Sequence, residues 1–368
     1  MFIQRVNNVR RLMERLNLDA IMLTSESNML YTSGYSGISL ERLISLLILR
    51  EYDRVFLVIP KLEEKRAEEN CKLEDVELLS YSDVEDPLTI LKEIFSRYRL
   101  VNVGVEGVIQ FKFIHPLLSK ISNLKVSLID DLMYSLRIVK DSQEIDKMKK
   151  AAEINNRLMV EAIQELRPGI SEKSFMAFIK NRAFELGADE VPFTLVQSGV
   201  NSALPHQEPT SKIISKDDVV VLDVGVRYEG YYSDITRTIV CGRPSSRHLE
   251  IFNIVLNSQQ KSLNNIRQGV KAEEIDMCAR GVIESAGYGE YFIHRTGHGI
   301  GLEVHEPPYI KIGNTQRLEE GMAFTVEPGI YLPGYFGVRI EDNVIVRREG
   351  CINLTNLAKS LYPEDYTL

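Results

Sequence analysis

Hydrophobic positions in the first third of the chain follow two alternating patterns. Short apolar runs typical of strands lie at residues 18–25, 43–50, 54–60, 101–107 and 125–130. Charged stretches of helical character such as 61–70 separate these runs, and the apolar positions of 3–16 recur at the spacing of an amphipathic helix. Strands and helices that take turns predict an α/β N-terminal domain with a mostly parallel or mixed sheet.

The pattern changes near residue 140. Asp141 followed by Glu144 is typical of a capping box, so we expect a long helix from there to Pro168-Gly169. Further helices are predicted at 171–187, 246–267 and 271–286, and strands within 217–228, 231–241, 322–332 and 338–346. Helices segregated against antiparallel hairpins predict an α+β C-terminal domain. The predicted domains are residues 1–135 and 136–368.

Composition narrows the function without identifying it. A chain of 368 residues exceeds one ordinary core and fits two domains. Its net charge of -8, with both signs interspersed, does not match a nucleic-acid-binding protein. Four widely spaced cysteines without a Cys-x-x-Cys pair argue against a thiolate zinc site. The start lacks the apolar core of a signal peptide, and the longest apolar run, at 44–49, is too short to span a membrane. We therefore expect a cytoplasmic protein without membrane contact.

The first candidate chemistry is a pair of aspartates in one predicted hairpin. Asp223 and Asp234 lie in consecutive strands, and their midpoint falls between Tyr228 and Glu229, within the polar stretch that must turn. The sequence therefore predicts that the two aspartates face each other across the hairpin. Like charges in that arrangement destabilise a sheet, and burial increases the cost.

A second hairpin repeats the arrangement with glutamates. Glu327 and Glu341 are centred on Gly334, within the turn sequence LPGYFG. A single acid in a strand is usually structural, but two hairpins that each place acids about their turns argue for a bound cation. Carboxylate-rich sites suit hard or borderline divalent ions.

Histidines near these hairpins add candidate ligands. His298 is bracketed by glycines, which allow close approach of the backbone, and His305 follows seven residues later. An imidazole among carboxylates favours a transition metal over calcium. His206 lies in a loop rich in Gly, Pro and Asn. The GHGIG sequence alone also fits a phosphate loop, but it lacks the lysine of a P-loop and the full GxGxxG spacing.

Taken together, these motifs resemble a known family. SDITRT, HRTGHGIGLEVHE, VEPGIY and VRIED are similar to segments of prolidase, Xaa-Pro aminopeptidase and methionine aminopeptidase, whose catalytic domain has the pita-bread fold. The N-terminal third, with YTSGYSG and then SLRIVKDSQEI, resembles the creatinase-type domain of the proline-specific branch. The resemblance implies a metal-dependent peptidase that cleaves Xaa-Pro bonds, most simply in dipeptides.

The resemblance also assigns the metal ligands. It implies two divalent ions per subunit, with manganese, cobalt and zinc as candidates. Asp223 would bind one ion, His298 and Glu327 the other, and Asp234 and Glu341 would bridge them. Short proline-containing peptides are the expected partners, and a homodimer is the expected assembly.

The remaining implied roles concern the substrate. Glu327 would handle the proton of the attacking water, while His206 and His305 would bind substrate and stabilise the carbonyl oxygen during catalysis. Arg339 is the cation expected to meet the substrate carboxylate. Tyr309, a further substrate-binding candidate, stands where some prolidases carry an arginine for that purpose.

Several alternatives stay open at this stage. The tyrosine at 309 leaves room for an Xaa-Pro aminopeptidase that acts on longer peptides. A non-catalytic binding protein of the same fold, or a creatinase that needs no metal, is disfavoured by the intact ligand set. Methionine aminopeptidase is disfavoured by the N-terminal domain. His294 is either a neighbour of the metal ligands or a structural residue, and no role is expected for His115 or His248.

Overall fold

The computed structural model describes residues 1–37 and 40–367. They form two compact units, which divide between Arg137 and Ile138, and each unit has a hydrophobic core of its own. In the described part of the chain, no helix has both the length and the apolar character that crossing a bilayer requires.

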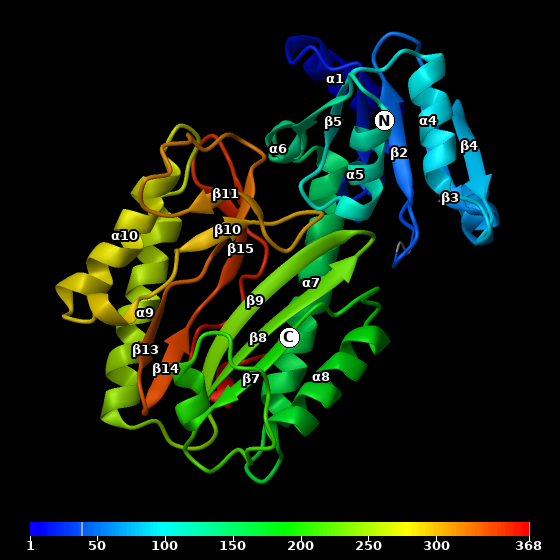
Figure 1. The fold of residues 1–368 in the computed structure, drawn as a ribbon. Coiled ribbons are helices and arrows are strands. Elements are labelled where there is room, and N and C mark those ends of the chain that lie inside the picture. Colours follow the sequence, from blue (N-terminus) through cyan, green and yellow to red (C-terminus); the bar gives the residue numbers. More distant parts are fainter. Residues whose placement is uncertain (38–39, 368) are drawn as a thin grey trace. The chain divides into compact units, whose positions relative to one another are not determined.

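The N-terminal unit is built on a mixed sheet with the strand order β4-β3-β2-β1-β5-β6 (Figure 1). Strand β1 pairs antiparallel with β2 and parallel with β5. The strands are β1 (Ala20–Leu23), β2 (Ser45–Leu49), β3 (Val55–Pro60), β4 (Val76–Tyr81), β5 (Asn102–Val105) and β6 (Lys125–Leu128). The helices are α1 (Phe2–Arg15), α2 (Glu26–Ser33), η1 (Lys61–Glu63), α3 (Glu64–Asn70), α4 (Pro87–Arg97), α5 (Phe111–Lys120) and α6 (Asp130–Arg137). The predicted α/β domain is confirmed.

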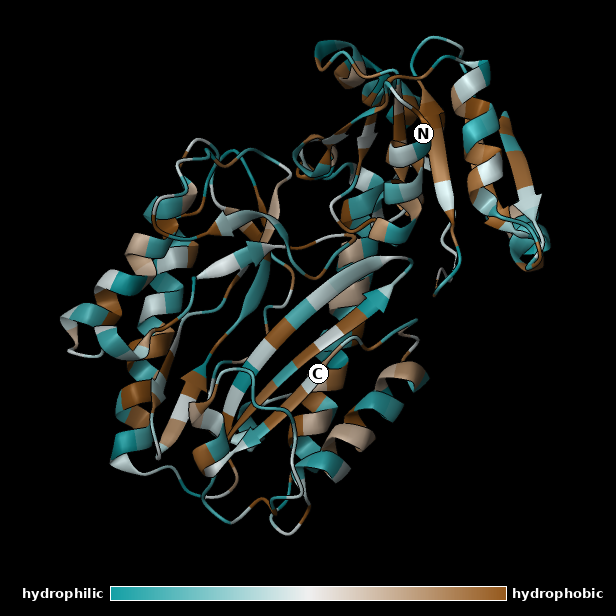
Figure 2. Ribbon diagram, viewed as in Figure 1, coloured by the Kyte–Doolittle hydropathy of each residue, from teal (hydrophilic) through white to brown (hydrophobic). Residues whose placement is uncertain are grey.

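Three of these strands are buried runs that the sequence predicts clearly. Strands β1, β2 and β3 are buried along their whole length, as expected for continuous apolar runs. Figure 2 shows β2 as a largely hydrophobic arrow, whereas α4 alternates between hydrophobic and polar positions. Edge strand β4 is not predicted, because its residues mix glutamate and serine with apolar types and show no clear strand pattern.

The first half of the C-terminal unit packs two helices against a sheet of order β7-β8-β9. Its elements are α7 (Ser142–Glu165), α8 (Glu172–Glu185), β7 (Thr194–Ser198), η2 (Gly199–Ala203), β8 (Val219–Tyr228) and β9 (Tyr231–Val240). The predicted capping box starts α7: Asp141 accepts from the Glu144 amide, and Glu144 accepts from the Asp141 amide. Ser171 caps α8 in the same way, by accepting from the Ser174 amide.

The turn between β8 and β9 corrects one prediction. Glu229 and Gly230 both have positive φ, 44° and 86°, and form a two-residue turn that pairs Tyr228 with Tyr231. Asp223 therefore pairs with Thr236, and Asp234 pairs with Gly225. The predicted direct opposition of the two aspartates is wrong. Both still lie on one face, because the register differs from the predicted one by two residues and side chains alternate with that period.

The second half contains a sheet of order β11-β10-β12-β15-β16, the hairpin β13-β14 and a pair of helices. Its elements are α9 (Ser246–Asn265), α10 (Ala272–Ser285), η3 (Gly289–Tyr291), β10 (Gly297–Gly299), β11 (Glu306–Ile310), β12 (Ala323–Val326), β13 (Gly329–Leu332), β14 (Phe336–Arg339), β15 (Asp342–Val346), β16 (Cys351–Asn353) and η4 (Pro363–Asp365). The predicted helices and the α+β class are confirmed.

The β13-β14 hairpin confirms a centre at Gly334 but shortens the predicted strands. Its outermost pair is Gly329 with Arg339, so Glu327 and Glu341 lie two residues beyond the ladder and not opposite each other within it. Glu327 falls between β12 and β13, and Glu341 falls between β14 and β15. Each glutamate thus occupies the point where the chain passes from one sheet to the other.

The two halves of this unit repeat one backbone arrangement. After α7, the Gly169 amide donates to the carbonyl of Ile214; after α9, the Gly269 amide donates to the carbonyl of Leu318. Both glycines have positive φ, 96° and 88°. The unit therefore consists of two halves with a similar arrangement of helix pair and sheet. Asp223 and Asp234 lie on β8 and β9 of the first half, and Glu327 and Glu341 lie between strands of the second half.

Candidate metal centre

A cavity of about 590 Å³ lies in the C-terminal unit where strands of both halves meet. It collects every predicted metal ligand, together with the predicted catalytic histidines and Arg339. The residues that line it are Phe193, Leu195, Pro205, His206, Glu208, Asp223, Asp234, His294, Arg295, His298, Val304, His305, Glu327, Tyr331, Arg339 and Glu341. Tyr309, predicted to bind substrate, is outside this lining.

The two aspartates are supported from behind. Asp223, on β8, accepts a 2.6 Å ion pair through Oδ2 from Nη2 of Arg339. Asp234, on β9, is buried, and its backbone amide donates to the Asn343 side chain at 2.8 Å. Burial, with the nearby charges of Glu341 and Asp223, raises the pKa of Asp234 well above its ordinary value.

The two glutamates are fixed through their backbone amides. The Glu327 amide donates to the carbonyl of Thr296 at 2.8 Å, and the Glu341 amide donates to the carbonyl of Thr236 at 3.1 Å. Burial raises the pKa of Glu327 to about 7 and moves that of Glu341 well above its ordinary value. Without a cation, the pocket therefore holds protons that the same side chains would lose in water.

The imidazole of His298 has one orientation that satisfies its hydrogen bonds. Its Nδ1 lies 3.1 Å from the carbonyl of Gly299, so Nδ1 must carry hydrogen and donate. Burial lowers the pKa of His298 well below its ordinary value, so the ring is neutral near pH 7. Its Nε2 lone pair then points to carboxylate oxygens, 3.3 Å from Oε1 of Glu327 and 3.9 Å from Oδ2 of Asp234.

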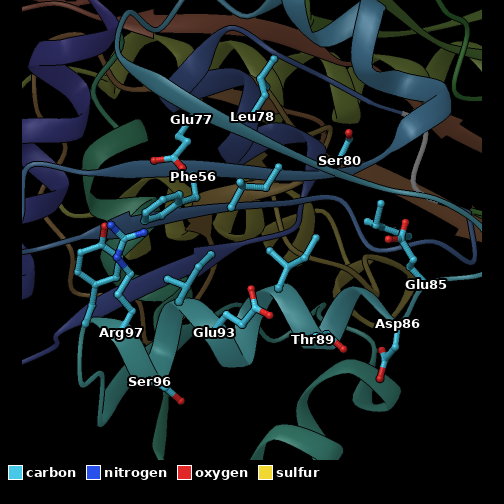
Figure 3. A pocket seen from close by; sticks show the side chains of 15 residues that line it. Phe56, Glu77, Leu78, Ser80, Glu85, Asp86, Thr89, Glu93, Ser96 and Arg97 are labelled. Carbon is cyan, nitrogen blue, oxygen red and sulfur yellow. The ribbon is translucent and has the colours of Figure 1, made fainter.

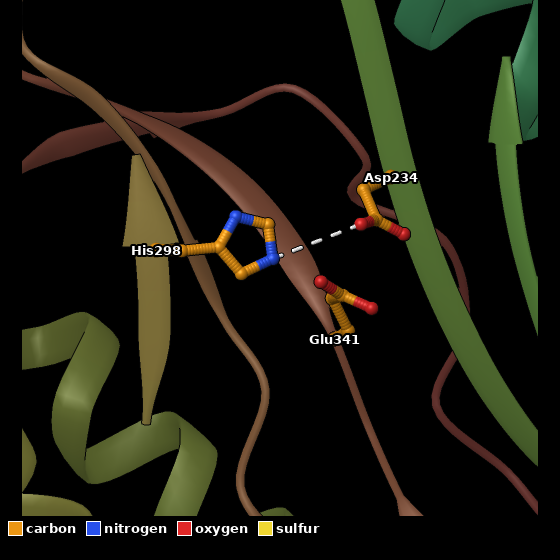
Figure 4. A group of neighbouring side chains, drawn as sticks. All are labelled: Asp234, His298 and Glu341. Carbon is orange, nitrogen blue, oxygen red and sulfur yellow. Dashed lines mark ion pairs between the residues drawn. The ribbon is translucent and has the colours of Figure 1, made fainter. Parts of the chain in front are cut away.

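A lone pair that faces carboxylates needs a proton or a metal cation between them, and the acids themselves favour the metal. Oδ1 of Asp223, Oδ1 of Asp234 and Oε1 of Glu341 are buried without a hydrogen-bond partner among the described residues. Ligand atoms of Asp234, His298 and Glu341 lie within 4.8 Å of one another (Figure 4). Unpartnered buried carboxylate oxygens are costly, so this donor set fits a divalent metal.

Arg339 is committed to the protein. Besides its ion pair with Asp223, it donates through Nε to Thr236 Oγ1 at 3.2 Å and through Nη1 to the Tyr331 hydroxyl at 2.9 Å. Its side chain is only 3% exposed, so little of it is open to a ligand. The geometry makes Arg339 a support for Asp223, which differs from the substrate contact that the sequence predicts.

The predicted catalytic histidines lie at the open side of the cavity. His206 and His305 are exposed, and the ring of His305 meets that of His298 edge to face at 4.0 Å. Desolvation by the atoms packed around its ring, with the charge of Arg295, lowers the pKa of His305, although the residue as a whole is exposed. Tyr309 is half-buried and carries the guanidinium of Arg295 on its ring.

His294, whose role the sequence leaves open, joins a hydrogen-bonded chain. Its Nδ1 donates to the carbonyl of Arg295 at 2.7 Å, so Nε2 accepts from the Tyr331 hydroxyl at 2.9 Å. Burial lowers the pKa of His294 to about 4. The chain therefore ends on Arg339 and helps to hold it. Tyr331 in VEPGIY and Arg295 in HRTGHGIGLEVHE are cavity residues that the sequence does not single out, because neither is a usual metal-ligating residue type.

Another cavity lies within the N-terminal unit. It measures about 840 Å³ and is lined by residues of β3, β4, α4 and the segment before α4, including Phe56, Glu77, Glu93 and Arg97 (Figure 3). Its lining contains acids but no histidine, and those acids are not buried together. The metal-ligating chemistry therefore belongs to the C-terminal cavity.

Comparison with known proteins agrees with this site. Residues 146–348 match the model of metallopeptidase family M24, and residues 5–139 match that of the creatinase/prolidase N-terminal domain. The chain belongs to metallopeptidase family M24. It is thus a metal-dependent peptidase, and the expected fold, a creatinase-type domain followed by a pita-bread catalytic domain, is confirmed. Membership implies bound divalent metal ions.

Individual relatives match almost the whole chain. The chain is 35% identical over 359 residues to a protein named Xaa-Pro dipeptidase from Pyrococcus furiosus, which covers 97% of this chain and 99% of that protein. A prolidase structure from Thermococcus sibiricus superposes with a TM-score of 0.94 at 36% identity, covering 98% and 99% of the two chains. An X-Pro aminopeptidase structure from Thermotoga maritima superposes with a TM-score of 0.88 at 34% identity, covering 97% of this chain and 99% of that chain.

The raised pKa of Glu327 predicts how the metal-free protein responds to pH. The folded protein holds this proton more tightly than the unfolded chain does, so the associated stability is full below about pH 4.5 and is lost as the pH rises through about 7. In the presence of a chelator, the free energy of unfolding of Glu327→Gln should rise relative to that of the wild type by on the order of 2–3 kcal/mol as the pH goes from 5 to 8. Urea unfolding across that range measures the gap. A gap that stays constant with pH would contradict the assigned cause.

Proposed function

We propose that this metallopeptidase hydrolyses the Xaa-Pro bond of dipeptides. One observation carries the proposal: three buried, unpartnered carboxylate oxygens and the Nε2 lone pair of His298 converge in one cavity. The relatives named Xaa-Pro dipeptidase and prolidase, similar over nearly the whole chain, support the choice of substrate.

The proposed centre contains two divalent ions, with manganese, cobalt and zinc as candidates. Asp223 would hold one ion, His298 and Glu327 the other, and Asp234 and Glu341 would bridge them. Four carboxylates match the charge of two dications, which removes the repulsion among the buried acids. When bound, such ions supply an acidified water as nucleophile and polarise the scissile carbonyl.

The protein's own groups then manage protons and orientation. An Xaa-Pro amide nitrogen bears no hydrogen, so proline leaves only after that nitrogen gains a proton. Glu327 would accept a proton from the attacking water and deliver it to the leaving nitrogen, because its carboxylate lies in the same cavity as the other proposed ligands. His206 and His305, at the open side, would donate hydrogen bonds to the oxygen that becomes negatively charged.

Apolar side chains complete the proposed substrate site. Phe193, Leu195 and Val304 line the same cavity as the acids. A pyrrolidine ring offers no amide hydrogen for recognition, so the wall must select it by shape. The volume of about 590 Å³ falls within the usual range for small-molecule sites.

A second candidate, an Xaa-Pro aminopeptidase for longer peptides, is supported by the mouth of the cavity. An adjoining hollow of about 450 Å³ is lined by Leu204, Gln207 and Ile293. It shares three lining residues with the main cavity, namely Pro205, His206 and His294. It offers space for residues beyond proline. The Thermotoga maritima X-Pro aminopeptidase has a similar fold.

A metal-supplemented assay tests the proposal and separates the two candidates. We expect hydrolysis of Xaa-Pro dipeptides that a chelator abolishes and added metal restores. The kcat/KM for dipeptides should be at least about tenfold above that for Xaa-Pro-Yaa tripeptides, because a tripeptide lacks the carboxylate on proline and loses one charged contact with the enzyme. Comparable or better kcat/KM on tripeptides would favour the aminopeptidase. Chelator-resistant activity would contradict the metal assignment.

Replacing Asp234 by alanine should abolish activity and reduce metal content together. A bridging ligand serves both ions, so its loss disturbs both. The variant should fold, because removing one of several clustered acids relieves repulsion in the metal-free state. Metal analysis and circular dichroism of the purified variant measure the two effects. Full activity would rule out the bridging role.

Replacing His206 or His305 by alanine should keep the metal but lower kcat by roughly 10²–10³. Neither ring is assigned to an ion, and each is placed to contact the reacting oxygen. His115→Ala is the matched control, because His115 lies exposed on α5 in the other unit. Stoichiometric loss of metal in either site variant would show that the residue is a ligand.

A further inference from the structure

The two arginines that line the catalytic cavity differ in what they contact. Each of the three nitrogens of the Arg339 guanidinium donates to a protein oxygen, namely Thr236 Oγ1, the Tyr331 hydroxyl or Asp223 Oδ2. Among the residues that the structure describes, the Arg295 guanidinium makes no hydrogen bond or ion pair with a side chain. It lies over the ring of Tyr309, 4.6 Å from the centroid, and borders the cavity.

We infer that Arg295, seated on Tyr309, binds the C-terminal carboxylate of the dipeptide substrate. This inference rests on the proposed Xaa-Pro activity and deepens it, because it names the group that would limit the enzyme to dipeptides. A guanidinium stacked on an aromatic ring keeps the N–H donors at its edge available. Two of these donors can bind the two oxygens of a carboxylate in a bidentate pair. The carboxylate is the chemical feature that separates a dipeptide from the amino-terminal part of a longer chain.

The charge distribution leaves little choice of cation. Apart from histidines, the cavity lining contains two cationic residues, Arg295 and Arg339. Arg339 already forms an ion pair with Asp223. Arg295 lines the same cavity as His206 and His305. An anion held there lies within reach of the catalytic histidines.

The backbone at Arg295 is fixed on both sides. The carbonyl of Arg295 accepts from Nδ1 of His294 at 2.7 Å. The next amide, that of Thr296, donates to the buried carboxylate of Asp276 at 3.0 Å. The backbone that carries the supporting ring is also held, since Asn314 donates to the carbonyl of Tyr309 at 2.6 Å. A preorganised side chain loses less freedom when a ligand binds.

Tyr309 thereby acquires a role different from direct substrate contact. It lies outside the cavity lining and supports Arg295 from beneath. A tyrosine at this position therefore remains compatible with carboxylate recognition, because a neighbouring segment supplies the cation. Tyr309 acts as a positioning residue, and Arg295 touches the substrate.

Kinetics with matched neutral and charged substrates test the inference. Arg295→Ala should lower kcat/KM for an Xaa-Pro dipeptide by about 10- to 100-fold, mainly through KM, and leave the C-terminal amide Xaa-Pro-NH2 nearly unaffected. Arg295→Lys should restore part of the preference. Arg247→Ala is the control: this arginine also stacks on a tyrosine, Tyr288, at 5.2 Å, but outside the cavity. An unchanged ratio between dipeptide and amide in Arg295→Ala would overturn the inference.

The support is tested separately with Tyr309. Tyr309→Phe keeps the ring and should keep the dipeptide preference, whereas Tyr309→Ala should reduce it by several-fold through KM, with unchanged metal content. If Tyr309→Phe loses the preference as fully as Tyr309→Ala, the hydroxyl acts directly and the supporting role is wrong.

A binding measurement separates failure of this inference from failure of the proposed function. Calorimetry compares proline with prolinamide on metal-loaded wild type and Arg295→Ala. Proline should bind the wild type more tightly, and the difference should vanish in the variant, even if no Xaa-Pro hydrolysis is detected. Hydrolysis by the wild type, with proline binding unaffected by Arg295→Ala, keeps the function and rejects the inference. A loss confined to dipeptides with an acidic Xaa would assign Arg295 to that side chain instead and overturn it.

Discussion

The structure depends on the cost of burying four carboxylates in one cavity. Their neighbours are other acids and a neutral imidazole whose lone pair faces them. Arg339 neutralises one acid by pairing with Asp223, and protons occupy others in the metal-free state, as the raised pKa of Glu341 indicates. Protons or bound cations must offset this cost, so the fold and the metal requirement follow from a single electrostatic constraint.

Holding such acids together requires a rigid frame behind them. Arg237 and Asp342 form a 2.8 Å ion pair that is fully buried, and Nη1 of the same arginine donates to the backbone carbonyl of Glu341 at 2.6 Å. On the opposite side, a side chain at Gly297 would approach the carbonyl of Thr325 to 1.8 Å. This close contact of β10 with β12 brings His298 to the acids. Repulsion between carboxylates can then be relieved by cation binding but not by moving the strands apart.

Sequence could predict which residues form the centre more readily than how they are arranged. Acids symmetric about turns indicate a cation, because patterns of residue type survive small register errors. The register itself depended on two consecutive residues with positive φ, Glu229 and Gly230, and the first of these is not a residue type that signals such a turn. The switch of the chain between sheets at Glu327 and Glu341 is set by tertiary packing. No local sequence pattern shows this switch. Edge strand β4 is also not predicted, because its residues mix glutamate and serine with apolar types.

The arginines show why a motif match does not fix a role. Arg339 stands two residues before Glu341, a proposed metal ligand, and pairs with Asp223 in space, yet desolvation obliges it to satisfy its donors within the protein. If it turned toward substrate, the carboxylate of Asp223 would lose its charged partner, and an unpaired buried charge is strongly destabilising. Recognition of a substrate anion therefore requires a cation that is only partly buried, as Arg295 is. Separating the two tasks lets substrate preference change at the mouth of the cavity without disturbing the acids at its base.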